Sequence, residues 1–180
     1  MPAVMAVKRL LPLRVQQQRF ALPLEVVERL LPLAALHPLP LAPEYVMGLL
    51  NFEGQSLLVI DLAGRLGMPM RSHYPVDIPL VLLKCAAYRA LLVVDEVYAV
   101  ETLLADRLRG EVLFKRGTAP LQAVVEMAAG TTLLLDCLRL LDVEISPGVE
   151  SALLDADLLT QSRIADTSAS PTTVTAVELR

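Results

Sequence analysis

The sequence predicts an all-β fold. Apolar runs of four to eight residues recur along the chain, and small polar or glycine-containing breaks separate them. Few windows before residue 150 keep the three-to-four spacing of a long amphipathic helix, so strands explain most of these runs. The chain has 180 residues, 54% of them hydrophobic, which suffices for one compact domain or for two small ones that share a core.

The first two predicted hairpins lie in the N-terminal third of the chain. Residues 11–15 and 20–24 flank three consecutive glutamines, and the prolines of this hairpin belong at strand edges or ends. Residues 45–52 and 55–60 flank a Glu-Gly pair, in which only the glycine adopts a positive φ at no steric cost. Both patterns predict antiparallel strands joined by a short turn.

Two further hairpins repeat this pattern. They pair residues 78–84 with 89–94 and residues 121–127 with 132–135. Extended segments at 26–31 and 97–103 raise the predicted number of strands from eight to ten, and the charged segment 105–117 is expected to be a surface loop. Ten short strands in one open sheet would leave long exposed edges, so we expect closure into two small barrels of five strands each.

The character of the chain changes near residue 146. Residues 146–148 read Ser-Pro-Gly, and four apolar residues with helical spacing follow, namely Val149, Leu153, Leu154 and Leu158. We therefore expect a β domain over residues 1–145 that contains both barrels, a helix over 146–165 and a mobile tail over 166–180.

The composition argues against several classes of protein. Lys and Arg number 16 against 20 Asp and Glu, no basic run follows a phosphate backbone and tryptophan is absent, so we expect no nucleic-acid partner. The most apolar stretch, residues 30–42, is short and interrupted by three prolines, so we expect no direct membrane insertion. Cys85 and Cys137 fit neither a disulfide framework nor a zinc site, which favours a reducing, cytoplasmic location.

No motif predicts a cofactor. Gly64 and Gly67 lack the third glycine and the Lys-Ser/Thr of a phosphate loop, and no G-x-S-x-G elbow occurs. His37 and His73 stand apart from any cysteine or carboxylate at a motif spacing, and an isolated histidine is far more often a surface or loop residue than a catalytic base.

Three aspartates that end apolar runs form the one pattern that could indicate catalysis: Asp61, Asp95 and Asp136. In α/β enzymes such residues meet at the carboxyl edge of a parallel sheet and bind magnesium, so a magnesium-dependent aspartyl enzyme is the alternative hypothesis. That fold needs crossover helices, which the prolines between residues 69 and 79 oppose. The competing explanation is that Asp61 and Asp136 cap short helices over residues 62–66 and 137–141.

Four fragments in a fixed order give the sequence a family resemblance. The longest reads P-x-x-P-E-Y-V-x-G-L-L-N-F-E-G at residues 40–54 and continues into V-I-D-L and R-L-G by residue 67. F-A-L-P-L begins at residue 20, V-V-D-x-V-x-x-V at 93 and L-L-D-x-x-x-L-L at 134. Together these fragments resemble the CheW-like domains of bacterial chemosensory arrays over about residues 10 to 142.

The resemblance implies a fold and a function without catalysis. The fold would be two interlocked five-stranded SH3-like barrels with short helices. The protein would be an adaptor that couples the cytoplasmic tip of a chemoreceptor to the regulatory domain of a CheA-type histidine kinase. It would be cytoplasmic and would reach membrane-associated receptor arrays through these partners.

The resemblance also implies two sets of partner-binding residues. The kinase side would comprise Val27, Arg29, Leu30 and Gly48, and the receptor side Glu53, Asp95, Val97 and Val100. Gly48 is expected to matter because the lack of a side chain permits a close backbone approach.

One turn departs from the family pattern. The family's Asn-Leu-Arg-Gly reads Asn51-Phe52-Glu53-Gly54 here. A carboxylate, which can only accept hydrogen bonds, therefore replaces a guanidinium, which donates them. Arg29 stands where family members often carry an acid, which suggests a compensating exchange of charge. A third hypothesis is an adaptor of the same fold that has lost receptor contact, in which case Glu53→Arg should gain receptor affinity.

Overall fold

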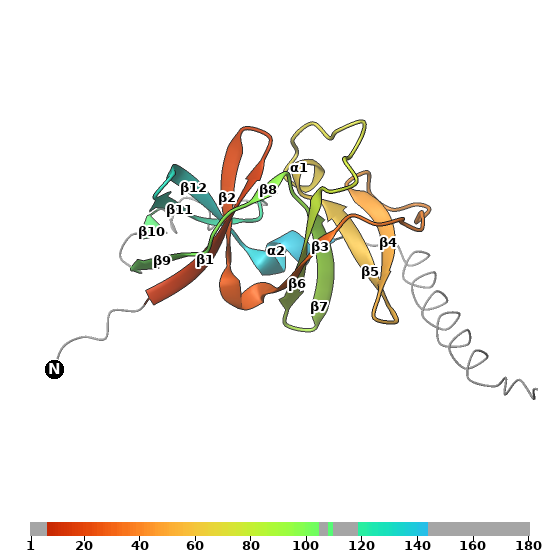
Figure 1. The fold of residues 1–180 in the computed structure, drawn as a ribbon, viewed down its shortest axis with the longest axis horizontal. Helices are drawn as coiled ribbons and strands as arrows, with labels where there is room; N and C mark the ends of the chain where they lie inside the picture. Colours follow the sequence, from red (N-terminus) through yellow and green to blue (C-terminus); the bar gives the residue numbers. More distant parts are fainter. Residues whose placement is uncertain (1–6, 105–107, 110–118, 144–180) are drawn as a thin grey trace, which may run out of the picture.

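Two mixed β-sheets make up most of the computed structural model, which describes residues 7–104, 108–109 and 119–143 (Figure 1). The first sheet has the order β10-β11-β12-β2-β1-β8, with β9 also paired to β1, and the second has the order β3-β6-β7-β5-β4. The strands of the first sheet are β1 (Val7–Val15), β2 (Gln18–Pro23), β8 (Glu96–Val97), β9 (Glu101–Leu104), β10 (Leu108–Arg109), β11 (Leu121–Met127) and β12 (Gly130–Leu135). Those of the second are β3 (Val27–Pro32), β4 (Val46–Phe52), β5 (Gln55–Asp61), β6 (Pro79–Cys85) and β7 (Tyr88–Val93). The helices are η1 (Leu24–Val26), α1 (Leu62–Arg65) and α2 (Cys137–Leu141).

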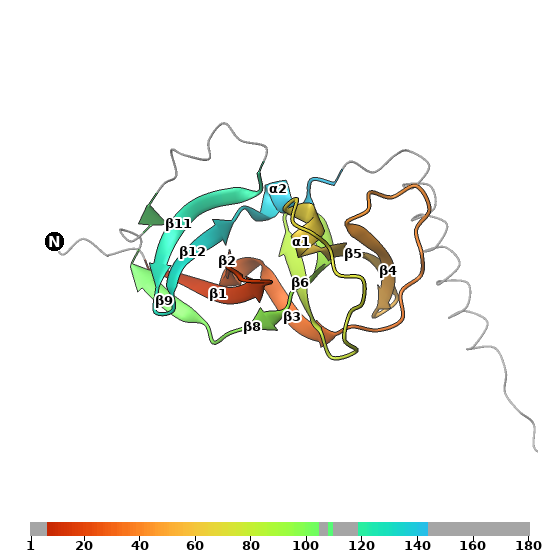
Figure 2. The ribbon, with the colours of Figure 1, turned by 90° about the horizontal axis from the view of Figure 1, so that it is seen from above.

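The second sheet is inserted into the chain of the first. Strands β3 to β7 follow one another, whereas the first sheet takes β1 and β2 from before this block and β8 to β12 from after it. One parallel pair in each sheet, β2 with β12 and β5 with β7, joins strands that are distant in sequence. The sheets stand side by side in Figure 2, with α1 and α2 where they meet. The all-β class and its interlocked halves are therefore confirmed.

One large apolar core is shared by the two sheets. Its buried side chains come from strands of both sheets and from both α-helices, as Leu13, Leu22, Leu83, Leu92 and Leu140 illustrate. Complete burial of a leucine stabilises a fold by about 1.5–3 kcal/mol, so this core binds the two sheets into one body. Two smaller buried clusters belong to the second and to the first sheet separately.

The turns are tighter than the sequence predicts. The β1–β2 and β6–β7 turns contain two residues each, because Gln16 and Ala86 adopt positive φ angles of 55° and 54°. In the β4–β5 turn Glu53 (φ 52°) shares the left-handed region with Gly54 (φ 81°), as the primed two-residue hairpin turns require. The predicted Glu-Gly turn is therefore present, and Glu53 adopts a positive φ in it although only a glycine does so at no steric cost.

Two expectations for the segment after β7 were also wrong. The predicted strand 97–103 is divided into β8 and β9, which pair with different parts of β1. The predicted surface loop 105–117 contains β10, whose two residues pair with Val124 and Val125 of β11. Both differences arise from pairing with strands far away in the sequence, which local composition does not report.

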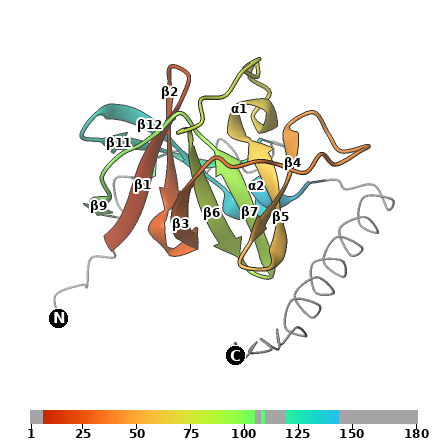
Figure 3. The same ribbon diagram turned by 45° about the vertical axis from the view of Figure 1, so that its right-hand side comes forward.

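The predicted closure into two barrels of five strands was wrong. The first sheet contains seven strands, and the edge strands β3 and β4 of the second sheet do not pair with each other. Figure 3 shows the second sheet from the side that carries β4 and β5. Instead of a strand, a single antiparallel bridge between His37 and Leu49 covers the β4 edge.

Both α-helices begin at an aspartate, as the capping hypothesis predicted. The Asp61 carboxylate accepts a hydrogen bond from the Gly64 amide at 2.7 Å, and the Asp136 carboxylate accepts one from the Arg139 amide at 3.2 Å. No helix in the described ranges has the length and the apolar content needed to span a bilayer. The predicted helix over 146–165 and tail over 166–180 lie outside the described residues.

Candidate protein-interaction sites

An exposed corner of the second sheet brings together residues of β3, of β7 and of the β4–β5 hairpin. We call Glu28, Arg29, Phe52, Glu53 and Arg89 the β3 corner. Arg29 Nη1 lies 3.2 Å from Glu53 Oε1, and its guanidinium carbon lies 5.4 Å from the centroid of the Phe52 ring. These contacts connect β3 to the β4–β5 turn, so Arg29 and Glu53, for which the sequence suggested a compensating exchange of charge, face each other.

Further contacts fasten β3 to the middle of the same sheet. Arg89 Nε of β7 lies 2.8 Å from Glu28 Oε2, and Arg89 Nη1 donates to the Gln55 side chain at the start of β5. The side chains of Arg29 and Glu53 are 57% and 62% exposed, and ion pairs in such positions contribute about 0–1 kcal/mol. The Arg29–Glu53 pair is therefore solvent-facing and contributes little to stability, while the Arg89–Glu28 pair is less exposed.

The other predicted kinase-side residues lie on β3 and β4. Leu30 is 47% exposed, whereas Val27 is half-buried and packs against the shared core. Gly48 is buried and has a φ of 142°. A Cβ at this position would fall inside van der Waals contact with the His37 carbonyl oxygen.

Two backbone hydrogen bonds depend on the approach of His37 to Gly48. The amides of His37 and Leu49 each donate to the other's carbonyl at 2.8 Å. The predicted reason for a glycine at position 48, a close backbone approach, is thus confirmed; an interface role for this residue stays a prediction.

The predicted receptor-side residues do not all lie together. Glu53 lies in the β3 corner, with the kinase-side residue Arg29. Val97 pairs with Leu13 of β1 and is half-buried, while Val100 is 43% exposed in the link between β8 and β9.

The fourth of these residues, Asp95, contacts its own chain. Its side chain is only 8% exposed. One carboxylate oxygen, Oδ2, accepts from the Gln16 amide at 2.5 Å and lies 2.8 Å from Arg71 Nη2. The Asp95 amide donates to the Arg14 carbonyl at 2.9 Å. Asp95 therefore links the β1–β2 turn to the segment that follows α1.

The three aspartates of the enzyme hypothesis serve separate contacts. Besides capping α1, Asp61 accepts a hydrogen bond from the Tyr74 hydroxyl at 2.5 Å; burial first, and then this carboxylate, raise the pKa of Tyr74. Asp136 caps α2, and Asp95 holds Gln16 and Arg71. In the described part of the chain no three His, Cys, Asp or Glu side chains are placed to bind a metal ion. The magnesium-dependent hypothesis therefore finds no support.

A groove of about 600 Å³ lies between the two sheets. One wall comes from β2, β11 and β12 of the first sheet, and the other from α1 and the residues after it. Its lining is mostly apolar and comprises Gln18, Phe20, Arg65, Leu66, Gly67, Met68, Ala119, Pro120, Leu121 and Leu133. Sequence reasoning missed these residues because no single local pattern contains both walls.

Arg65, one of the residues that line this groove, connects α1 to the C-terminal end of α2. Its guanidinium donates to the carbonyls of Arg139, Leu140 and Asp142 at 2.6, 3.1 and 3.1 Å. These are carbonyls at the C-terminal end of α2, which has no further turn to satisfy them. The guanidinium also lies 5.5 Å from the centroid of the Tyr45 ring.

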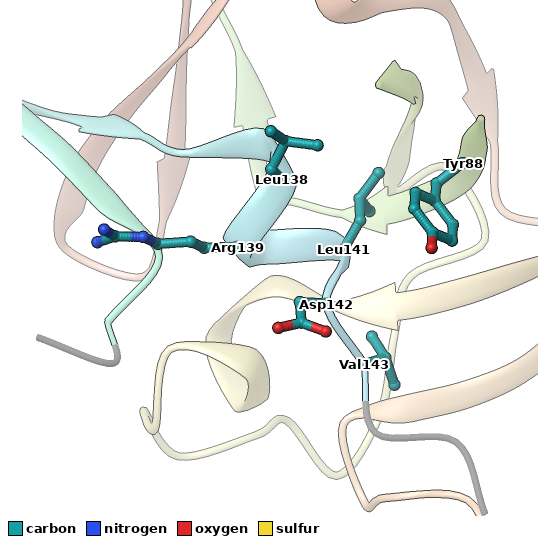
Figure 4. A pocket seen from close by; sticks show the side chains of 6 residues that line it. All are labelled: Tyr88, Leu138, Arg139, Leu141, Asp142 and Val143. Atoms are coloured by element: carbon teal, nitrogen blue, oxygen red, sulfur yellow. The ribbon is translucent and has the colours of Figure 1, made fainter. Parts of the chain in front are cut away.

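A smaller hollow of about 340 Å³ opens between α2 and the β6–β7 hairpin. In Figure 4 the Tyr88 ring lies near Leu141 and Val143, whereas the Arg139 side chain extends away from them. Burial first, and then the neighbouring Cys85 thiol, raise the pKa of the Cys137 thiol at the start of α2.

Comparisons with known proteins agree with this architecture. A family model for the CheW-like domain matches residues 9–144. The chain is 34% identical over 61 residues to the "Chemotaxis protein CheW" of Rhizobium meliloti (strain 1021), a match that spans 34% of this chain and 39% of that protein.

A solved structure shares the fold. The "scaffolding protein TtCheW" from Thermoanaerobacter tengcongensis superposes with a TM-score of 0.69 at 19% identity, covering 77% of this chain and 95% of that one. At this level of identity the likeness concerns the fold. The family model, in contrast, matches well over half of the sequence, and the chain therefore belongs to the CheW-like domain family.

Proposed function

We propose that this chain is a non-catalytic adaptor of a bacterial chemosensory pathway that couples a chemoreceptor tip to the regulatory domain of a CheA-type histidine kinase. The observation that carries the proposal is the presence of two different surfaces on one body. The β3 corner is charged and solvent-exposed, and β3 also carries the half-exposed Leu30, while the groove is mostly apolar and concave. Family membership supports the pathway. The chain would join membrane-associated arrays through these partners.

The two surfaces suit different partners. A groove that is mostly apolar fits the side chains of a helix, which is the form of a receptor tip. The β3 corner, beside the half-exposed Leu30, suits a partner domain with a complementary charged rim, so we assign it to the kinase. Titration calorimetry of the full chain with each purified partner tests the proposal, and a lack of binding to both would contradict it.

Separate variants should disable the two surfaces. Leu30→Asp is expected to weaken kinase binding at least tenfold, roughly the effect of losing one well-packed anchor, and to leave receptor binding unchanged. Gly67→Asn places a side chain at the groove. The backbone of Gly67 is left-handed (φ 72°), which asparagine tolerates, and nothing lies within 4 Å of the Cβ that the substitution would add. This variant should weaken receptor binding alone.

A matched control exists for the groove variant. Gly130 also has a positive φ (109°) and open space where a Cβ would be added, but it does not line the groove. Gly130→Asn should therefore leave both affinities unchanged. Equal losses of receptor affinity in Gly67→Asn and Gly130→Asn would argue against the groove as the binding surface.

The charge arrangement of the β3 corner makes a further prediction. Glu53→Arg places a cation beside Arg29, and like charges at this distance repel, so we expect kinase binding to fall. Adding Arg29→Glu restores an ion pair of the opposite polarity. The double variant should bind better to a kinase from a pathway whose CheW-like adaptor carries the usual arginine in this turn. Calorimetry with both kinases measures this exchange. A gain of receptor affinity in Glu53→Arg would instead favour an adaptor that has lost receptor contact.

A further inference from the structure

Hydrogen bonds connect the α1 side of the groove to the first sheet and its helix α2 at two places. Arg65, which lines the groove, donates to the carbonyls of α2, and α2 follows β12. At the second place the Gln16 side-chain amide donates to the Pro69 carbonyl at 2.5 Å. Gln16 lies in the β1–β2 turn, near Gln18 of one wall, and Pro69 directly follows Met68 of the opposite wall. Gln16 and Pro69 themselves do not line the groove.

Asp95 organises the second of these ties. Its carboxylate accepts from the backbone amide of Gln16 on one side and pairs with Arg71 on the other. Gln16 has a left-handed backbone (φ 55°), so this hydrogen bond fixes the turn from which its side chain reaches Pro69. Because the Asp95 side chain is 8% exposed and does not line the groove, it presents almost no surface to a partner.

We propose that Asp95 is a positioning residue that sets the width of the groove. Its carboxylate holds Gln16, which lies beside one wall, together with Arg71, which lies in the segment that continues the other wall. This inference rests on the proposed function, because the groove is the surface assigned to the receptor tip. The physical gain is preorganisation. A groove held at its working width does not have to be ordered when a helix enters it, and that ordering would reduce the affinity.

Hydrogen exchange without any partner tests the positioning role first. Asp95→Asn keeps the size of the side chain and an acceptor for Gln16 but removes the charge that pairs with Arg71, and Arg71→Gln removes the same pair from the other side. In both variants the amides of residues 66–72 should exchange about threefold to thirtyfold faster at a temperature well below unfolding. The double variant should add little to either single change.

The same loop offers a control. Asp77 is exposed and lies outside the contacts of Asp95, so Asp77→Asn should leave the exchange of residues 66–72 as it is in the original chain. Unchanged exchange in Asp95→Asn, or equal acceleration in Asp77→Asn, would overturn the inference.

Binding of a purified receptor-tip hairpin provides the second measurement. Asp95→Asn should weaken its affinity by about threefold to thirtyfold with unchanged stoichiometry, and the hairpin should slow exchange in residues 66–72 more in the variant than in the original chain. A merely destabilised protein would lose stoichiometry instead. An unchanged affinity of Asp95→Asn for the hairpin would refute the positioning role and leave the proposed function intact. If the original chain itself does not bind the hairpin, the proposed function is refuted. The exchange experiment then still decides the role of Asp95.

Discussion

Replacement of Gly48 by alanine is expected to destabilise the fold by about 2–6 kcal/mol, since a strained positive φ costs about 1–3 kcal/mol and a forced overlap costs a similar amount. The φ of 142° strains any L-residue, and the added Cβ would overlap the carbonyl oxygen of His37. Relief of the overlap requires that His37 move away, which would break the two hydrogen bonds between His37 and Leu49.

The loss should be measured by urea unfolding monitored by far-ultraviolet circular dichroism, because the chain has no tryptophan. Gly130→Ala is the matched control, since Gly130 has a φ of 109° but nothing lies within 4 Å of the Cβ that alanine would add. It should cost only the strain, about 1–3 kcal/mol. Equal losses in the two variants would show that contact with His37 is unimportant. Faster exchange at the Leu49 amide in Gly48→Ala would show that the bridge has opened.

Replacement of Arg65 by methionine is expected to destabilise the fold by about 2–4 kcal/mol, as expected when several charge-assisted hydrogen bonds are lost together. Methionine keeps most of the aliphatic stem but leaves the carbonyls of Arg139, Leu140 and Asp142 without their donor. Since α1 follows a strand of the second sheet and α2 follows a strand of the first, the variant should loosen the junction between the sheets.

Arg29→Met is the control for this prediction. It removes the same type of side chain from an ion pair whose members are more than half exposed, and it should change stability by at most about 1 kcal/mol. Urea unfolding of both variants at one pH compares them directly. Arg65→Met would contradict the prediction if its midpoint fell no further than that of Arg29→Met.

Local features of this fold were predictable from sequence, and distant pairings were not. The caps formed by Asp61 and Asp136 followed from an acidic residue placed directly before a short apolar run, which is a relation within one turn. The hairpin strands likewise followed from apolar runs around a turn. The division of residues 97–103 and the presence of β10 depend on β1 and β11, and no local pattern shows such partners.

The candidate sites divide in the same way. The sequence suggested a compensating exchange of charge between Arg29 and Glu53, but only the structure shows that the two side chains meet. Asp95 stood out in the sequence, yet its contacts with Gln16 and Arg71 come from the way the chain folds back on itself. The groove had no sequence signal because its walls come from segments that are separated by the whole second sheet.

The inserted arrangement of the second sheet has a consequence for biosynthesis. Phe20 of β2 pairs in parallel with Leu133 of β12. During translation β2 therefore leaves the ribosome long before β12 has been synthesised. The intervening strands β3 to β7 pair only among themselves and are able to assemble first. During translation the edge of β2 therefore stays open, and folding should be slow, as is usual where contacts join distant parts of a chain. Until the β11–β12 hairpin is made, the exposed edge of β2 is a place where a strand of another chain could pair.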